Sequence, residues 1–454
     1  VLGGVPGPLG ADPGPIVLAP GGIVSPFARL WAGKTGTTIF NRDLIATGSP
    51  AGVCGFGTSG PGTNQVVVMN GNIFVQTHLQ MQASSVEPMI INGTISGPGM
   101  LSDGFDSAQI LNAANTYSGG TEIREGLWLV GNNAALGSGT VWFASPAGDG
   151  RLGAFAAART IANPIVFANP PTYVGEQNLT LSGPLDLAGR VVTHTSNSTA
   201  TITYAGVLTN GGLSKAGAGT LVLAADNQHT GGTTVVSGPL VVAHPDALGQ
   251  GPLVVNPAGQ AIAQPDLPQA VRAIAVSIAI GGTFDLNNNP LVIDYSGDSP
   301  IDALRPQLAD GGLTSSLLTP DTRLAYLDNT RVGLESFGNR SIDPTSVLVF
   351  MARTGDANLD GIVNRLDLDI LASNWQATTA SWIDADFTYD GFVNVRDLYV
   401  LATNWQESSA LDEALAGLGL PDVIVPEPGV VVGLLAVLYG SMKRPRRRFC
   451  AAGR

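Results

Sequence analysis

Two stretches of twelve residues near the C-terminus carry the side chains best suited to chemistry. They begin at Asp356 and Asp386, and in both the oxygen-bearing side chains stand at positions 1, 3, 5, 9 and 12, with glycine at position 6. A calcium ion takes about six to eight oxygen ligands, and this spacing wraps such a set around one ion. The sequence therefore predicts two Ca²⁺ sites. The expected ligands are Asp356, Asn358, Asp360, Ile362, Asn364 and Asp367 in the first site, and Asp386, Thr388, Asp390, Phe392, Asn394 and Asp397 in the second.

The positions of each loop have separate roles. Ile362 and Phe392 would contribute backbone carbonyls, and the glycine permits the sharp turn because it tolerates positive φ. The closing carboxylate is an aspartate, one methylene shorter than the glutamate of the general EF-hand pattern, so the following helix must begin closer to the ion. Thr388 is a weaker ligand than Asn358, and the second site is expected to bind calcium more weakly. The alternative is a solvated turn rich in Asp, Asn and Gly.

The duplication disfavours that alternative, because the same helix follows each loop. Apolar residues recur at i, i+3, i+4 and i+7, which predicts one buried face per helix with both tryptophans in the core. These residues are Leu368, Leu371, Ala372 and Trp375, and Leu398, Leu401, Ala402 and Trp405. The region 353–408 resembles a type I dockerin. The resemblance implies a small α-helical, EF-hand-like module that folds with calcium and docks onto a cohesin-like or other surface protein, often in polysaccharide-degrading assemblies.

The dockerin family recognises its partners through loop positions 10 and 11, often a small hydroxyl pair. The corresponding residues here are Arg365-Leu366 and Val395-Arg396. They are not hydroxyl residues, and they differ between the two loops. The resemblance therefore implies docking, while these residues depart from the usual recognition pair.

Composition points to a β-rich repeat protein of two or three domains. The 454 residues include 59 glycines, only 13% are charged, and the net charge is −13. Low charge with many glycines suits short strands separated by turns. Nine of the 35 acidic residues lie in 353–408, where metal ligation accounts for them, and this balance argues against a nucleic-acid partner. Cys54 and Cys450 stand far apart in the chain, and no structural disulfide is expected.

The body of the chain contains an internal repeat at an offset of 112 residues. The stretch 115–141 aligns with 227–253, so that Asn115 matches Asn227, Gly119-Gly120 matches Gly231-Gly232, and Ala135-Leu136-Gly137 matches Ala247-Leu248-Gly249. Short β-rich pieces between glycine turns predict stacked coils, which bury a common core. A β-sandwich with Gly-rich hairpins is the alternative. The two copies resemble the autotransporter-associated β-strand repeat, which implies a right-handed parallel β-helix on the cell surface.

The remaining segments surround this body, which is assigned to 27–290. Residues 1–26 are rich in Pro and Gly and are interpreted as an irregular lead-in with no visible N-terminal signal peptide. Residues 291–352 are interpreted as a β cap and junction. Strands are expected at 284–286, 291–295 and 346–350, and a short helix at 301–309. Residues 409–425 form a linker.

The C-terminal tail, 426–448, has a different character. An uncharged stretch, 429–442, follows Pro426-Glu427-Pro428 and precedes a cluster of basic residues, which predicts a hydrophobic helix held beside a membrane. Together these features resemble a PEP-CTERM sorting signal. The resemblance implies export, transient membrane anchoring and cleavage by an exosortase.

A catalytic site is not expected. The chain has no Asp-Asp pair, and its four histidines are isolated; His229 and His244 are expected at the surface or in turns. The sequence therefore predicts a mainly β, non-catalytic, exported surface or extracellular protein with Ca²⁺ as its cofactor and a β-helix stalk or adhesive body that contacts glycans. The alternative is a polysaccharide-degrading enzyme, a glycoside hydrolase or lyase, or a subunit of such an assembly.

Overall fold

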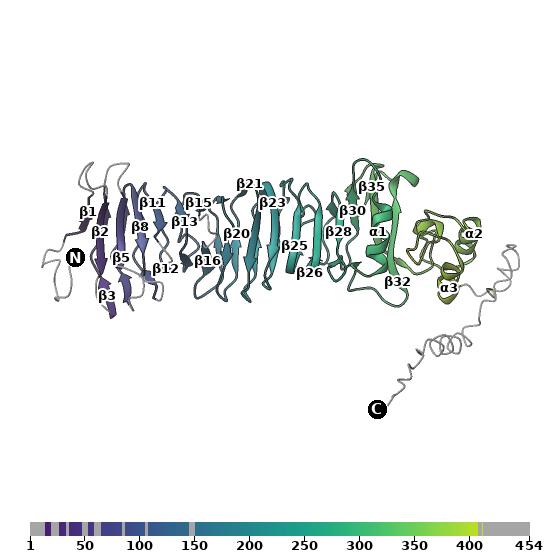
Figure 1. Cartoon of the computed structure of the whole chain (residues 1–454), viewed down its shortest axis with the longest axis horizontal. Coiled ribbons are helices and arrows are strands. Elements are labelled where there is room, and N and C mark those ends of the chain that lie inside the picture. The colour runs from purple at the N-terminus through teal and green to yellow at the C-terminus, as the bar shows by residue number, and fades with distance from the viewer. Residues whose placement is uncertain are drawn as a thin grey trace, which may run out of the picture. The chain divides into compact units, whose positions relative to one another are not determined.

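The chain divides into two compact units. A computed structural model describes residues 14–19, 27–32, 36–47, 53–58, 65–83, 87–104, 108–144, 150–406 and 411 (Figure 1). The first unit comprises Val1–Leu317 with Asp328–Phe350, and the second comprises Leu318–Leu327 with Met351–Arg454. We refer to them as the solenoid unit and the loop–helix unit.

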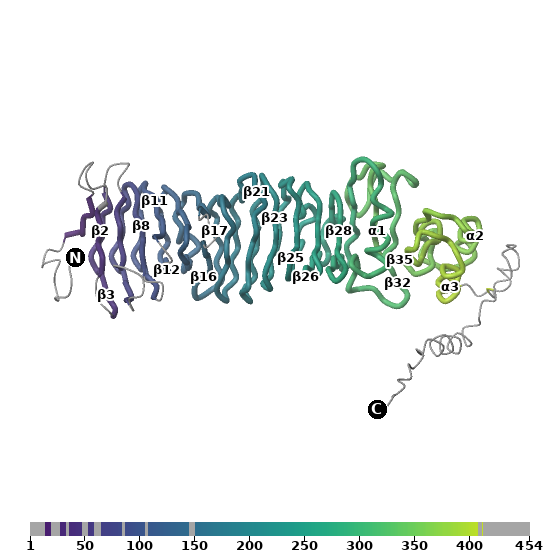
Figure 2. The backbone as a smooth tube through the Cα atoms, in the orientation of Figure 1, coloured from purple at the N-terminus to yellow at the C-terminus, as the bar shows by residue number. Residues whose placement is uncertain are grey.

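The solenoid unit is a parallel β-solenoid, whose coils stack as successive rungs (Figure 2). Paired residues in neighbouring rungs lie from 19 positions apart, as in Leu221 and Leu240, to 29 positions apart, as in Leu44 and Ile73. Its strands are β1 (Ile16–Leu18), β2 (Phe27–Ala32), β3 (Gly36–Phe40), β4 (Leu44–Ala46), β5 (Val53–Thr58), β6 (Gln65–Met69), β7 (Ile73–Val75), β8 (His78–Gln82), β9 (Met89–Ile91), β10 (Ile95–Ser96), β11 (Met100–Asp103), β12 (Ala108–Leu111), β13 (Thr121–Ile123), β14 (Leu127–Val130), β15 (Val141–Phe143), β16 (Arg151–Ala154), β17 (Arg159–Ile161), β18 (Ile165–Phe167), β19 (Thr172–Tyr173), β20 (Leu179–Leu181), β21 (Leu185–Ser196), β22 (Ile202–Tyr204), β23 (Leu208–Ala216), β24 (Leu221–Leu223), β25 (Thr233–Val242), β26 (Leu253–Ala263), β27 (Val271–Ala273), β28 (Val276–Ile278), β29 (Thr283–Asp285), β30 (Leu291–Asp294) and β31 (Leu313–Thr314).

Alternation along each short strand builds the core. Most three-residue strands bury their first and third residues, as β24 does with Leu221 and Leu223. Successive side chains of a strand point to opposite faces, so the inward set of each rung meets the inward sets of its neighbours. Aromatic rings stack in this way between rungs: Phe167 lies 5.5 Å from Phe143 and 5.8 Å from Tyr204, centroid to centroid.

Two kinds of residue form the close corners between strands. A Cβ atom on Gly206 would lie 1.7 Å from the carbonyl oxygen of Gly183 in the rung before it, so only glycine fits there. Elsewhere asparagine side chains hydrogen-bond from rung to rung with Nδ2–Oδ1 distances of 2.8–2.9 Å. This series consists of Asn41, Asn70, Asn92 and Asn112. The corners therefore hold neighbouring rungs in register.

The two sequence repeats adopt the same buried network. Asn115 accepts from the Ile95 N–H at 2.7 Å and donates to the Ala135 carbonyl at 2.6 Å. Asn227 does the same with Leu208 at 2.9 Å and Ala247 at 2.7 Å. Each asparagine thus joins three successive rungs from inside the corner, which explains why the repeat retains it.

The solenoid unit ends in a small cap. Helix α1 (Ile301–Ala309) lies beside the last rungs, where the Gln307 side chain accepts from the Ile278 N–H at 2.9 Å. Strand β30 pairs antiparallel with β35 (Ser346–Arg353), and β33 (Ser336–Phe337) forms a hairpin with β34 (Arg340–Ser341). A 3₁₀ helix, η1 (Asn329–Arg331), precedes that hairpin. The cap covers strand edges that would otherwise stay unpaired.

The loop–helix unit is small, and its helices are short. It contains α2 (Arg365–Ser373), the 3₁₀ helix η2 (Trp382–Asp384), α3 (Val395–Thr403) and most of β32 (Thr322–Asp328). The two halves are cross-linked: the Gln376 N–H donates to Val393 O and the Gln406 N–H donates to Val363 O, both at 2.9 Å. Each helix end is therefore tied to the loop of the other half.

The structure confirms part of the sequence-based architecture. The stacked coils are confirmed, and the β-sandwich alternative is wrong because the rung-to-rung strand pairings in the described residues are parallel. The helix at 301–309 and the strands near 284, 291 and 346 are also found. The lead-in is not wholly irregular, since Ile16–Leu18 pairs with Leu44–Ala46. The hydrophobic helix expected at 429–442 lies outside the described residues, and the right-handed coiling stays a prediction.

Replacing Asn227 by alanine should destabilise the solenoid by about 3 kcal/mol, because two buried backbone groups, Leu208 N–H and Ala247 C=O, would lose their partner. The measurement is the denaturant midpoint of the β signal. Asn112→Ala is the matched control: its side chain bonds at the exposed surface, and we expect a loss below about 1 kcal/mol. Equal losses in the two variants would contradict the role of the buried asparagine.

Candidate metal centre

The start of each helix positions the last two predicted ligands of its loop. The Leu366 N–H donates to Asn364 Oδ1 at 2.7 Å, and the Asn364 N–H donates to Asp367 Oδ2 at 2.9 Å. This is a capping box, which satisfies N–H groups that the first helical turn leaves unpaired. Asn394 and Asp397 form the same box at the start of α3.

The closing aspartates also reach back to the beginning of their loops. Asp367 Oδ1 accepts from the Ala357 and Asn358 N–H groups at 2.8 and 3.1 Å. Asp397 Oδ1 accepts from the Phe387 and Thr388 N–H groups, both at 3.0 Å, and from Thr388 Oγ1 at 2.9 Å. A short aspartate can therefore close each loop because the helix begins directly at the loop.

The first aspartate of each loop bends the chain around itself. The Gly361 N–H donates to Asp356 Oδ2 at 2.8 Å, and the Gly391 N–H donates to Asp386 Oδ2 at 3.0 Å. The two glycines have φ values of 89° and 80°, where a side chain would be strained. The predicted glycine role is thus visible in the backbone.

The second loop brings three carboxylates together. One oxygen from each of Asp386, Asp390 and Asp397 lies within 4.8 Å of the others. Two ligands on opposite sides of a calcium ion stand about 4.8 Å apart, so one ion could contact all three. Among the described residues, this is the one group of three acidic, histidine or cysteine side chains that meets this distance criterion. The residues of the second loop fit the predicted ion.

The first loop has the same fold with a looser set of carboxylates. The Asn358 amide donates to Asp360 Oδ2 at 2.8 Å, and Asn358 Oδ1 accepts from the Asp360 N–H at 3.0 Å. These two predicted ligands therefore bond to each other. The expectation that the second site is the weaker one stays a prediction.

Burial dominates the electrostatics of the loops. It raises the pKa of Asp356, Asp367 and Asp397 from the ordinary value of an aspartate, and neighbouring carboxylates add to the effect. Burial and neighbouring acids raise the pKa of Asp386 to about 6, against the opposing hydrogen bond from Tyr326. A divalent cation would offset this concentration of negative charge.

The position-7 residues keep their side chains out of the loops. Ile362 and Phe392 are each 52% exposed. This placement suits residues that would offer an ion only their carbonyls. Both loops therefore place apolar side chains in solvent beside the predicted ligands.

The tryptophan prediction was wrong. Trp375 and Trp405 are half-buried, whereas Trp382 is fully buried. Its Nε1–H donates to Asp356 O at 2.6 Å, and its ring meets Phe387 edge to face at 5.1 Å. Trp382 lies between the two repeats, so periodicity within the helices could not indicate it.

The sequence analysis also did not predict that the segment Leu318–Leu327 contacts the second loop. The Tyr326 hydroxyl donates to Asp386 Oδ2 at 2.6 Å, and the Tyr389 hydroxyl donates to Leu324 O at 2.9 Å. No signal in the sequence connects this segment to the second loop, which begins sixty positions after Tyr326.

His229 is placed differently from the prediction, whereas His244 lies half-buried at a turn, as expected. His229 is fully buried and Nε2 lies 2.9 Å from Thr233 Oγ1, in the place where Tyr117 bonds Thr121 at 2.5 Å in the other repeat. His194 is fully buried as well, with Nδ1 3.0 Å from Tyr204 Oη. Both are buried core residues of the solenoid.

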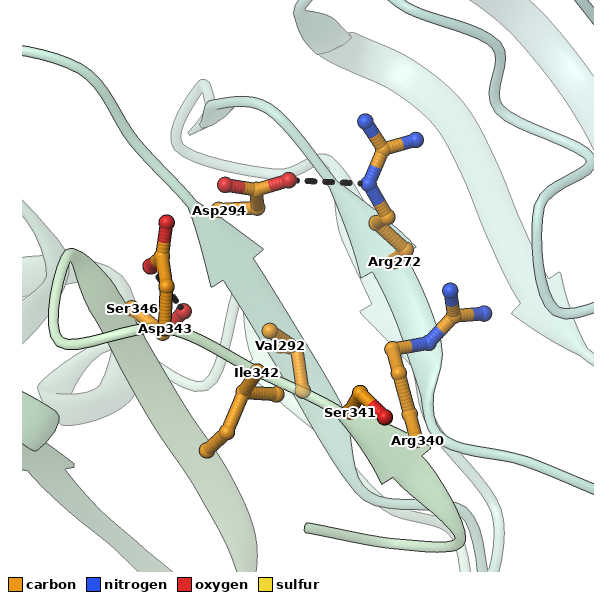
Figure 3. A pocket seen from close by; sticks show the side chains of 8 residues that line it. All are labelled: Arg272, Val292, Asp294, Arg340, Ser341, Ile342, Asp343 and Ser346. Atoms are coloured by element: carbon orange, nitrogen blue, oxygen red, sulfur yellow. Dashed lines mark hydrogen bonds and ion pairs between the residues drawn. The ribbon is translucent and has the colours of Figure 1, made fainter. Parts of the chain in front are cut away.

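The cap of the solenoid unit contains a polar pocket of about 270 Å³ (Figure 3). Its lining residues are Arg272, Val292, Asp294, Arg340, Ser341, Ile342, Asp343 and Ser346. Arg272 Nε donates to Asp294 at 3.0 Å, and Arg340 forms a bidentate pair with Asp246, both bonds being 2.9 Å. These ion pairs brace the cap against the solenoid turn that contains Asp246.

Two stretches of the chain, 107–127 and 213–242, match the Passenger-associated-transport-repeat family. They fall on the two sequence repeats, over β12–β14 and β23–β25. No curated protein and no solved structure matches the chain. The repeat matches and the parallel solenoid together support a repeat-containing, exported protein of the surface or secreted passenger type. In the part of the chain that the structure describes, no helix has the length and apolar character needed to cross a bilayer.

Because two histidines are buried in the solenoid, we expect its free energy of unfolding to fall at acidic pH. Burial lowers the pKa of His194 to about 3, with Lys215 adding to the effect, and lowers that of His229 to about 4. An unfolded histidine binds a proton near pH 6.5, so the unfolded state is favoured as pH falls below that value. At pH 4.5 each histidine should cost about 2 kcal/mol relative to pH 7.5, measured as the free energy of unfolding.

The control is His229→Tyr, which installs the residue of the equivalent repeat position. It should reduce the acid loss by about half of the combined histidine effect, because only His194 still titrates. An unchanged pH profile in this variant would contradict the assignment.

Proposed function

We propose that the chain is a non-catalytic, exported surface protein in which a calcium-loaded loop–helix unit docks a partner. The observation that carries the proposal is the pair of identically capped loops, in which Asp367 and Asp397 close each loop onto its own first residues. The close approach of three carboxylates, those of Asp386, Asp390 and Asp397, supports calcium as the ion. The resemblance to type I dockerins supports docking as the use of that ion.

Calcium would act here as a structural ion. Its charge would offset that of the gathered carboxylates, which burial disfavours when they are ionised. The chain would hold it through Asp356, Asn358, Asp360, Ile362, Asn364 and Asp367, and through Asp386, Thr388, Asp390, Phe392, Asn394 and Asp397. The backbone hydrogen bonds of Gln376 and Gln406 join the two halves, so calcium binding in one loop would also stabilise the other.

A docking face would use the apolar residues exposed beside the loops. Leu366 is 57% and Val395 is 53% exposed, and Tyr399 on α3 is 40% exposed. Such side chains gathered on a small unit suit a protein interface. The proposed occupant is a cohesin-like or other surface protein.

The solenoid would serve as a stalk or an adhesive, glycan-contacting body. Its long series of backbone ladders supports a structural role. Incubation with plant and algal polysaccharides tests the non-catalytic part. Released reducing ends or unsaturated sugars would overturn it in favour of a polysaccharide-degrading enzyme.

The tail, which lies outside the described residues, would direct sorting. The uncharged stretch 429–442 followed by basic residues supports transient membrane anchoring with cleavage by an exosortase near Pro426–Pro428. The intact mass of the mature protein tests this step: a mass that retains the tail would contradict it.

Chelation of calcium from the full chain should unfold 353–408 and leave the solenoid intact, because an ion that binds only the folded state stabilises that state. Calorimetry with and without chelator should show one transition that moves and one that does not. At a calcium concentration of 100 times Kd, the gain is about 2.7 kcal/mol.

Two substitutions provide the matched comparison. Asp356→Ala removes a charged ligand and should weaken the first site more than Thr388→Ala weakens the second, as measured by calcium titration. Identical melting of the loop–helix unit in excess calcium and in excess chelator would contradict the metal assignment.

A further inference from the structure

The first aspartates of the two loops differ in what surrounds them. In the described residues, the Asp356 carboxylate accepts from N–H groups of its own loop, such as those of Asp360 and Gly361. The Asp386 carboxylate accepts the corresponding bonds from Asp390 and Gly391. It accepts one more from outside the loop, from the Tyr326 hydroxyl. The second loop is therefore held by a part of the chain that the first does not use.

The two oxygens of the Asp386 carboxylate have different hydrogen-bond partners. Oδ2 receives the Tyr326 hydroxyl at 2.6 Å and the Gly391 N–H at 3.0 Å. Oδ1 receives the Asp390 N–H at 3.2 Å, a long bond. The carboxylate is thus oriented mainly through Oδ2, which accepts the two shorter of these bonds.

Tyr326 is itself held firmly. Its side chain is fully buried, and its ring lies 5.8 Å from that of Tyr389. The Tyr389 hydroxyl donates to Leu324 O at 2.9 Å, and Arg323 Nη1 donates to Phe387 O at 3.3 Å. These three hydrogen bonds join 323–326 to the second loop, and among them the Tyr326 bond is the one that reaches a predicted ligand.

We propose that Tyr326 is a positioning residue for calcium in the second loop, so that this site includes the segment Leu318–Leu327 as well as 386–397. The inference rests on the proposed calcium function. Residues that hydrogen-bond a metal ligand fix its orientation, and their loss typically costs about 10–100-fold in metal affinity. Among the described residues, the Asp356 carboxylate of the first loop accepts from its own loop, so the affinity of the two sites would be set differently.

The test uses the full chain with calcium binding removed from one loop by substitution of its first aspartate. In an Asp356→Ala background, isothermal titration with calcium reports the second loop. Adding Tyr326→Phe keeps the buried ring and removes only the hydroxyl, and the affinity should fall about tenfold. In an Asp386→Ala background, the same substitution should leave the affinity of the first loop unchanged.

Tyr389→Phe is the matched control, because it removes a hydrogen bond between the same two segments without touching a ligand. It should change the second-loop affinity by less than about threefold. Thermal melting of the calcium-free variants measures any purely structural effect. Equal loss of affinity in the two tyrosine variants would overturn the proposal, because segment docking alone would then explain it.

An unchanged affinity in Tyr326→Phe, with calcium binding intact in the unsubstituted chain, would overturn the positioning role alone. If the unsubstituted chain binds no calcium in either loop, the proposed function fails and this inference fails with it.

Discussion

The solenoid depends on hydrogen bonds that each rung can obtain only from its neighbours. A strand of three residues such as Leu221–Leu223 is too short to be stable alone, and its backbone groups are paired because rungs on both sides supply partners. Close stacking then dictates glycine at corners such as Gly206 and alternation along the strands. It also leaves backbone groups of the last rungs in need of other partners, and the Gln307 side chain of α1 accepts one of them, the Ile278 N–H.

The loop–helix unit meets its backbone requirements with side chains. Carboxylates and amides of the loops accept hydrogen bonds from backbone N–H groups that have no backbone partner within the loop or the first helical turn. Asp367, for example, accepts from the N–H groups of Ala357 and Asn364. These acceptors are the groups that the calcium proposal requires. Asp367 thus stabilises the start of the helix and also places a carboxylate in the loop. Its burial there raises the pKa of that carboxylate.

The sequence predicted much of this arrangement because the relevant patterns are local. Two copies at an offset of 112 residues indicated stacked coils, and two loops thirty residues apart indicated a pair of helices. It failed where a residue's partners come from elsewhere in the chain. His229 looked like a turn residue, yet it lies in the core, as its equivalent Tyr117 does in the other repeat. Trp382 was overlooked because it belongs to neither helix.

By itself, the sequence determined the two repeat copies, the helices after the loops and the oxygen-bearing loop positions, since each can be recognised from a run of neighbouring residues. Only the tertiary structure decided which side chains lie inside and which distant segment completes a site. Tyr326 stands sixty residues before Asp386, and no periodicity relates them. Their contact arises from the packing of Leu318–Leu327 against the second loop, because burial of the two tyrosine rings brings a hydroxyl to the carboxylate.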